Sequence, residues 1–193
     1  MEMENRDRPT NPPLEQRFFI ALMPPQAIQD YANTVIQDLG DRYRTHTARC
    51  APHVTLQPPF LWNPNKVEPL VDCLSHFASQ HQSIPVQLSG FGAFPPRVLY
   101  LNVLKTPELL ALQAALQQTL ESTLGITDPK SKHRPFAPHL TVASRNFTGQ
   151  TFRKAWAEYQ LRPFEGEFVG DRLTLLIYRE RWSIHSEFPL RTA

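Results

Sequence analysis

The chain has 193 residues, of which 41% are hydrophobic and 20% charged, a composition typical of a folded protein of one domain or two small lobes. The formal net charge of +2 is too small for a surface that coats nucleic acid, although a local basic pocket for one or two phosphates is compatible with it. Two cysteines, Cys50 and Cys73, exclude a disulfide framework, and no apolar run approaches the length of a membrane span.

The first half of the chain alternates between strand and helix patterns. Residues 1–15 are polar and rich in proline, and we expect them to form a flexible N-terminal tail. Short apolar or alternating runs then predict strands, and apolar residues at helical spacing predict helices between them. The expected strands cover residues 17–24, 53–56 and 84–94, and the expected helices cover residues 25–40 and 67–81.

The second half begins the same order again. Its clearest helix has Thr106 as a capping residue, Pro107 at the first helical position and Gly125 at the end. The expected helices cover residues 106–125 and 152–160, and the expected strands cover residues 98–104, 139–144, 164–170, 172–180 and 182–190.

Both halves therefore contain a strand, a helix, a histidine-bearing strand, a helix and a strand, which indicates a weak internal duplication. We expect an α+β fold with two pseudo-symmetric lobes, each a small, mainly antiparallel sheet with flanking helices, around a central cleft. The expected organisation is a single bilobal domain over residues 16–193, with repeat halves at approximately 16–94 and 97–190.

The duplication is most visible in two short motifs, "APHVTL" at residues 51–56 and "APHLTV" at residues 137–142. Side chains two residues apart on a strand point to the same face, so His53 lies beside Thr55. For the same reason His139 lies beside Thr141. The aliphatic residues between them point the other way and can anchor each strand in a core. Each motif thus presents an imidazole and a hydroxyl on a rigid element.

Two imidazoles and two hydroxyls in one cleft are suited to cleaving a phosphodiester. Histidine has an unperturbed pKa of about 6.5, so His53 and His139 can divide the roles of acid and base near neutral pH. The hydroxyls of Thr55 and Thr141 can hold anionic phosphate oxygens. A 2′,3′-cyclic phosphate fits this set because its strained ring can be opened by water without a metal. A single His-x-Thr motif is usually structural, so the hypothesis depends on the pair.

These motifs resemble those of the two-histidine (2H) phosphoesterase superfamily, specifically its LigT-like group of 2′-5′ RNA ligases and cyclic phosphodiesterases. The hallmark of that group is a pair of His-φ-[Ser/Thr]-φ motifs in two pseudo-symmetric lobes. The resemblance covers about residues 16–190 and also includes the segments "FFIALMP", "HVTLQPPF", "LSGFGAFPPRVLYLNV", "RPFAPHLTVAS" and "LTLLIYRERWSIHSEFPL".

The resemblance implies hydrolysis of 2′,3′-cyclic phosphates on nucleotides or RNA ends, with 2′-5′ ligation as the reverse reaction. It also implies that His53 protonates the leaving oxygen and that His139 activates water. Relatives often carry an arginine five residues after the second motif histidine, where this chain has Ser144 followed by Arg145. That departure concerns the choice of substrate more than the chemistry.

Aromatic and basic residues near the motifs are further candidates for substrate binding. Phe60 follows the first motif and Phe136 precedes the second, and either can stack on a base at the cleft. Arg134 is the preferred member of a basic segment that can meet RNA phosphates. The other members of this segment are Lys130, Lys132 and His133, and the residues that precede the first motif in a similar way are Arg42, Arg44 and Arg49. Each also has a structural interpretation, as core or solvated surface.

No metal or cofactor is expected. His46, Cys50 and His53 are close in sequence, but a zinc site requires a fourth ligand and usually paired spacing. We expect a monomeric, cytoplasmic protein whose partner is a small nucleotide or an RNA 3′-end cyclic phosphate, without a membrane or an obligate protein partner. The alternatives are a non-catalytic module that binds a nucleotide or RNA end in the same cleft, and a duplicated scaffold for a protein partner.

Overall fold

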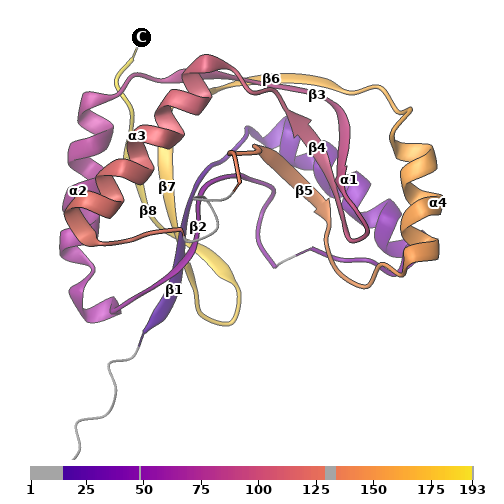
Figure 1. Cartoon of the computed structure of the whole chain (residues 1–193), viewed down its shortest axis with the longest axis horizontal. Helices are drawn as coiled ribbons and strands as arrows, with labels where there is room; N and C mark the ends of the chain where they lie inside the picture. The colour runs from indigo at the N-terminus through magenta and orange to yellow at the C-terminus, as the bar shows by residue number, and fades with distance from the viewer. Residues whose placement is uncertain (1–14, 48, 129–133, 193) are drawn as a thin grey trace, which may run out of the picture.

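The computed structural model describes residues 15–47, 49–128 and 134–192 (Figure 1). The strands are β1 (Gln16–Leu22), β2 (Val54–Trp62), β3 (Ile84–Phe94), β4 (Val98–Val103), β5 (His139–Ala143), β6 (Glu165–Gly170), β7 (Arg172–Tyr178) and β8 (Trp182–Pro189). The helices are α1 (Gln26–Tyr43), α2 (Glu68–Gln80), α3 (Pro107–Leu124) and α4 (Gly149–Tyr159), and a short 3₁₀ turn covers Pro64–Lys66. The predicted helices and strands are all present, and the α+β class is confirmed.

The strands form one curled antiparallel sheet in the order β6-β3-β4-β5-β2-β1-β7-β8. Its middle is the junction between β5 and β2, where the paired residues are Val54 and Leu140. This junction divides the sheet into a first group of strands, β2-β1-β7-β8, and a second group, β5-β4-β3-β6. These two groups are the two lobes of the fold.

Each group of strands combines both halves of the sequence repeat. β3 belongs to the first half but pairs with β4, and β7 belongs to the second half but pairs with β1. The connection between β3 and β4 is short, and a short connection favours antiparallel pairing of consecutive strands. The repeat halves therefore exchange strands rather than each folding into its own lobe.

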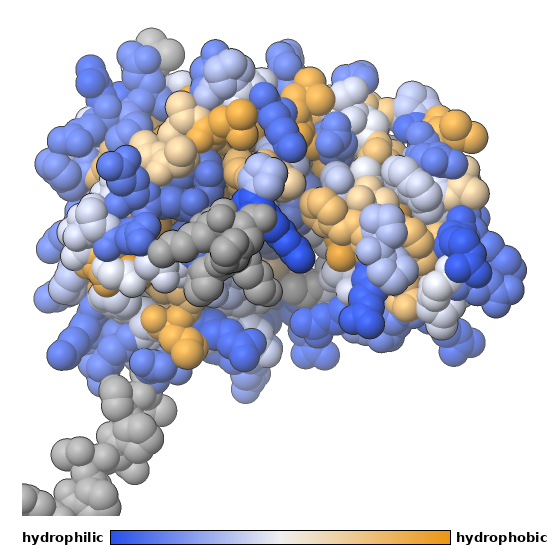
Figure 2. Space-filling model, in the orientation of Figure 1, coloured by the Kyte–Doolittle hydropathy of each residue, from blue (hydrophilic) through white to orange (hydrophobic). Residues whose placement is uncertain are grey.

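The helices cover the sheet in two pairs. α2 and α3 pack together, α2 against β7 and β8 and α3 against β2 and β3. α1 and α4 pack together beside β5, at the opposite end of the view in Figure 1. The main core lies between helices and sheet and includes Val54, Leu56, Leu140 and Val142. Figure 2 shows mostly hydrophilic residues on this side of the molecule, with hydrophobic ones in small groups.

The first motif strand is longer than the sequence indicates. β2 continues beyond Leu56 through two prolines to Trp62, and it pairs with β1 along this length. The register shifts between the Phe18–Phe60 pair and the Ile20–Gln57 pair, so one extra residue is accommodated on β2 there. Proline is tolerated at such an irregularity because a regular ladder bond is not required of it.

Among the helices that the structure describes, none is long and apolar enough to cross a membrane. The predicted tail lies outside the described residues, apart from residue 15.

Candidate active site

The two histidine motifs lie on adjacent strands at the junction of the two groups. Val54 and Leu140 pair in antiparallel register, and both side chains are fully buried in the core beneath the helices. Because side chains alternate along a strand, the residues on either side of this pair point to the opposite face of the sheet. The motifs are therefore brought together by strand pairing, rather than by two separate lobes that face each other across a gap.

The same register arranges the four polar side chains. One residue along the strands from the Val54–Leu140 pair, the antiparallel register places His53 opposite Thr141 on one side and Thr55 opposite His139 on the other. Directly opposed Cβ atoms on antiparallel strands are about 4.5–5.5 Å apart, and diagonal ones about 7–8 Å. Each imidazole thus lies beside the hydroxyl of the other motif, and the two imidazoles lie on a diagonal that can span one phosphate.

Both imidazoles are held in the same way. Nδ1 of His53 lies 2.8 Å from the carbonyl oxygen of Ala51, and Nδ1 of His139 lies 2.7 Å from that of Ala137. A carbonyl oxygen only accepts, so Nδ1 carries the proton and donates in each ring. The neutral rings therefore keep an unprotonated Nε2, the nitrogen that can accept a proton from a reactant. Each alanine precedes a proline, which restricts it to extended backbone and fixes the direction of its carbonyl.

Aromatic rings pack against both imidazoles. Phe19 lies 4.8 Å from His53 between ring centroids, and Phe94 and Tyr100 lie 5.0 and 5.2 Å from His139. Burial by such neighbours is the main reason that the pKa of each histidine lies below its ordinary value of 6.5. The alanine carbonyls raise the two pKa values in part, and a charge on His139 lowers the pKa of His53 further.

Two cavities adjoin the polar cluster. A cavity of about 440 Å³ is lined by Thr55 and His139, and its further lining includes Pro58, Gln113, Gln117, Asp128, Arg134 and Phe136. A smaller cavity of about 120 Å³ is lined by His53 and Thr141, together with Cys50 and Ser144. Each cavity therefore contains one histidine and the threonine of the other motif, as the strand register requires.

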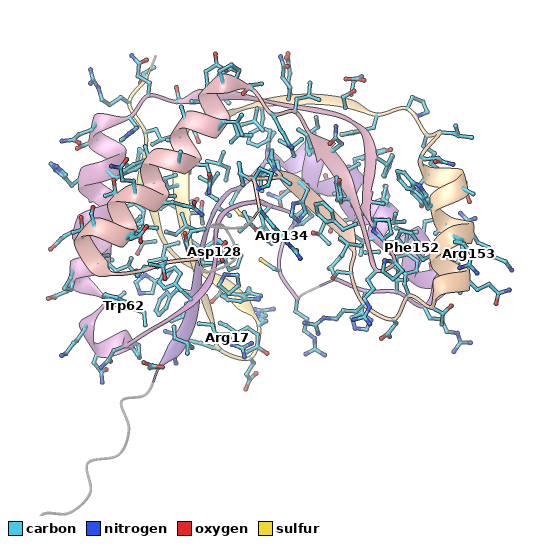
Figure 3. All side chains as sticks on the ribbon, in the orientation of Figure 1. Arg17, Trp62, Asp128, Arg134, Phe152 and Arg153 are labelled. Atoms are coloured by element: carbon cyan, nitrogen blue, oxygen red, sulfur yellow. The ribbon has the colours of Figure 1, made fainter. Side chains whose placement is uncertain are left out.

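The predicted substrate-binding residues separate into two sets. Arg134 and Phe136 line the larger cavity, and Figure 3 labels Arg134 near the centre of the molecule, between the two helix pairs. Phe60 lines neither cavity: its ring lies 6.3 Å from that of Phe18 and packs against the core, and its role in substrate binding stays a prediction. Lys130, Lys132 and His133 lie outside the described residues.

Two other basic candidates, Arg42 and Arg145, line neither of the two cavities. Arg42 forms ion pairs with Asp38 and Glu158 where α1 meets α4. Arg145 is exposed, and its backbone amide donates to the carbonyl of His46 at 3.1 Å. Within the described part of the chain, no group of three or more histidine, cysteine or acidic residues is placed to hold a metal ion.

Sequence reasoning missed Gln113, which lies on α3 and lines the larger cavity. Its side chain is 6% exposed, and its amide donates to the carbonyl of Leu56 at 3.3 Å. The sequence contains one signal for this residue, a glutamine between Leu112 and Leu116 on the buried face of helix α3. A buried polar side chain needs a hydrogen-bond partner, so its presence on that face indicates that the core there meets polar groups.

Comparison with known proteins finds a family model and relatives that match most of the chain. The family model of the 2′-5′ RNA ligase superfamily matches residues 24–182. A candidate phosphoesterase of Geobacillus sp. (strain WCH70) is 30% identical over 176 residues, which are 89% of this chain and 95% of the relative. Another from Bacillus cereus (strain B4264) is 30% identical over 175 residues, with the same two coverages of 89% and 95%.

Solved structures share the fold at lower identity. A protein of Thermus thermophilus superimposes with a TM-score of 0.69 at 19% identity, over 91% of this chain and 98% of that one. LigT of E. coli in its apo form gives a TM-score of 0.66 at 18% identity, over 92% and 98% of the two chains. LigT has also been solved in complex with 3′-AMP, with a TM-score of 0.63 at 18% identity over 91% and 98% of the chains.

Histidine titration followed by NMR tests the geometry of the site directly. We expect pKa values below 6.5 for both His53 and His139, because burial disfavours their charged forms. The variant His139→Ala is expected to raise the pKa of His53, because a neighbouring positive charge is removed. Arg153→Ala, an exposed change on α4, serves as the control. The arrangement is contradicted if both histidines have pKa values at or above 6.5 and the pKa of His53 is the same in the wild type and in His139→Ala.

Proposed function

The chain belongs to the 2′-5′ RNA ligase superfamily, and we propose that it is a phosphodiesterase that hydrolyses 2′,3′-cyclic phosphates of nucleotides or RNA ends. The observation that carries this proposal is the diagonal pair of His53 and His139, each with Nδ1 held by a carbonyl and Nε2 left for proton transfer. In-line displacement at phosphorus requires a base on the side of the attacking oxygen and an acid on the side of the departing oxygen, and the two imidazoles can take these two roles.

The reaction follows from these positions. One neutral imidazole accepts a proton from water at Nε2 while the water oxygen forms a bond to phosphorus. The ring P–O bond opposite breaks, and the other histidine, as imidazolium, protonates the departing ribose oxygen. Thr55 and Thr141 donate hydrogen bonds to the non-bridging oxygens, where negative charge increases. The product is a phosphomonoester with a free neighbouring hydroxyl, and solvent restores the two protonation states.

The same arrangement allows 2′-5′ ligation. If the 5′-hydroxyl of a second RNA end takes the place of water, its oxygen forms a bond to phosphorus, the P–O3′ bond of the ring breaks, and a 2′-5′ linkage forms. No additional group is required, because one histidine takes the proton from that hydroxyl and the other protonates the departing O3′; the same groups working in the opposite direction cleave the linkage.

The larger cavity supports a nucleoside as the rest of the substrate. Its volume of about 440 Å³ lies within the range of small-molecule sites. Phe136 offers a ring for stacking, Arg134 a cation for phosphate or base edges, and Gln113 an amide at the wall. E. coli LigT, which shares this fold, has been solved with 3′-AMP, so we propose a nucleotide of this kind as ligand here.

Substitution of the four polar residues tests the proposal. His53→Ala and His139→Ala are each expected to lower kcat for a 2′,3′-cyclic nucleotide by about 10²- to 10⁴-fold, since each removes one proton transfer. Thr55→Val and Thr141→Val are expected to cost about ten- to a hundredfold, the loss of one hydrogen bond to an anion. Thr55→Ser and Thr141→Ser keep the hydroxyl and serve as matched controls that retain most activity.

The wild-type assay is run with and without EDTA. Binding of cyclic nucleotides without turnover by the wild-type protein indicates the alternative, a non-catalytic binding module. Turnover that is present without EDTA and lost with it contradicts the metal-independent mechanism.

The pH dependence of hydrolysis is a further prediction. Activity rises with pH as the base loses its proton and falls as the acid loses its proton, so kcat/KM is bell-shaped. Because the pKa values of both histidines are lowered in the free protein, the maximum of kcat/KM is expected below pH 6.5. Bound phosphate raises both pKa values, so the maximum of kcat lies at higher pH. A profile of kcat/KM with a single limb, or with its maximum above pH 6.5, contradicts the prediction.

A further inference from the structure

A row of aromatic rings leads away from His53 across the face of the sheet that carries the motifs. The ring of Phe19 on β1 lies 4.8 Å from the imidazole of His53, and Trp182 on β8 lies 4.5 Å from Phe19. Tyr178 on β7 lies 5.3 Å from Trp182 and is 39% exposed. We call Phe19, Trp182 and Tyr178 the aromatic row. It connects the reactive histidine with the hairpin formed by β7 and β8.

Arginines border the exposed end of the aromatic row. Arg17 lies one residue before Phe18, so the pairing of Phe18 with Ile177 places it opposite Tyr178. Figure 3 shows Arg17 near the hairpin. Arg179 and Arg181 lie in the turn between β7 and β8.

These three arginines are without an acidic partner, as are several other arginines of the described structure. Arg17, Arg179 and Arg181 are exposed, and none of them makes an ion pair within residues 15–47, 49–128 and 134–192. Arg42 and Arg172, in contrast, each contact carboxylates. Glu180 lies between Arg179 and Arg181 in this turn, but it forms no ion pair with either of them in the described structure. The end of the aromatic row therefore carries three exposed arginines and one exposed acid.

This combination of rings and cations is the chemistry that binds single-stranded nucleic acid. Bases stack on exposed aromatic side chains irrespective of sequence, and arginines beside them contact the backbone phosphates. The larger cavity is lined by residues of β2, of α3 and of the segment that leads into β5, whereas the aromatic row begins on β1, on the other side of β2. A nucleotide in the cavity therefore leaves the row accessible to its neighbours in an RNA chain.

We propose that the exposed end of the aromatic row, which is Tyr178 and the partly buried Trp182, binds the nucleotides that adjoin the reacting phosphate together with Arg17, Arg179 and Arg181. Phe19 is only 3% exposed and packs against Trp182. The substrate is then an RNA strand that ends in a cyclic phosphate rather than a mononucleotide. This inference rests on the proposed function, since it assigns the substrate class of the same site.

The test compares two substrates, a 2′,3′-cyclic mononucleotide and a short oligoribonucleotide that ends in the same cyclic phosphate. For Tyr178→Ala, and separately for Arg181→Ala, the ratio of kcat/KM for the oligonucleotide to kcat/KM for the mononucleotide is expected to fall about tenfold. In Arg181→Ala, the slope of the logarithm of the oligonucleotide binding constant against the logarithm of salt concentration is also expected to become less steep by about one, which corresponds to one released counterion. The controls are Leu161→Ala, which truncates an 80% exposed apolar residue, and Arg153→Ala on α4, and both keep the wild-type ratio.

Binding measured without turnover separates this inference from the proposed function. Fluorescence anisotropy with a labelled oligoribonucleotide that ends in a 3′-hydroxyl is expected to show weaker binding by Tyr178→Ala and Arg181→Ala than by the controls. If the wild-type protein hydrolyses no cyclic phosphate yet shows this pattern, the proposed function fails and the binding surface stands.

Equal ratios and equal binding in all variants overturn the inference. It is also overturned if the hairpin variants lose binding to vesicles of anionic lipid, or lose concentration-dependent self-association, while oligonucleotide binding is unaffected. In those cases the same exposed rings and arginines serve a membrane surface or a second copy of the chain.

Discussion

The arrangement of the site depends on the register in which β2 and β5 meet. Val54 and Leu140 are paired and fully buried, and this pairing holds His53 and His139 on the opposite face at a fixed diagonal. A slip by one residue would turn the imidazole of His53 into the core and the side chain of Val54 out of it, at the cost of apolar burial and of an unsatisfied polar group. Packing under the helices therefore sets the geometry of the reactive groups above them.

The centre of the site is nearly symmetric, but its surroundings are not. Both histidines follow an Ala-Pro step, donate from Nδ1 to the alanine carbonyl and have lowered pKa values. One side opens into a cavity of about 440 Å³, and the other meets a cavity of about 120 Å³ and the aromatic row. Two equivalent imidazoles with different neighbours would suit the proposed reaction, because the two sides of its substrate differ.

The sequence predicts the elements well because their signals are local. The period of apolar residues, the cap at Thr106 and the glycine at Gly125 mark helix α3, and each motif marks its own strand. The pairing of distant strands carries no such signal. The exchange of β3 and β7 between the groups therefore appears only in the structure, and so does the meeting of the motifs on adjacent strands.

Two residues show how side-chain environments escape sequence reasoning. Its place after the first motif suggests that Phe60 can reach a base, but β2 continues past its prolines and pairs Phe60 with Phe18, against which its ring packs. Gln113 looks like an ordinary helical residue until α3 is packed beside the larger cavity. In both cases the deciding contact joins residues far apart in the chain.

The central claim is that the two histidines act as one unit on a single phosphate, and a double-mutant cycle tests it most directly. Hydrolysis of a 2′,3′-cyclic nucleotide is measured for wild type, His53→Ala, His139→Ala and the double variant. If both histidines act in one step, the double variant is expected to be about as slow as either single variant, because the effects of substituting groups that act together do not add. If the two losses multiply, the histidines act independently and the account is contradicted.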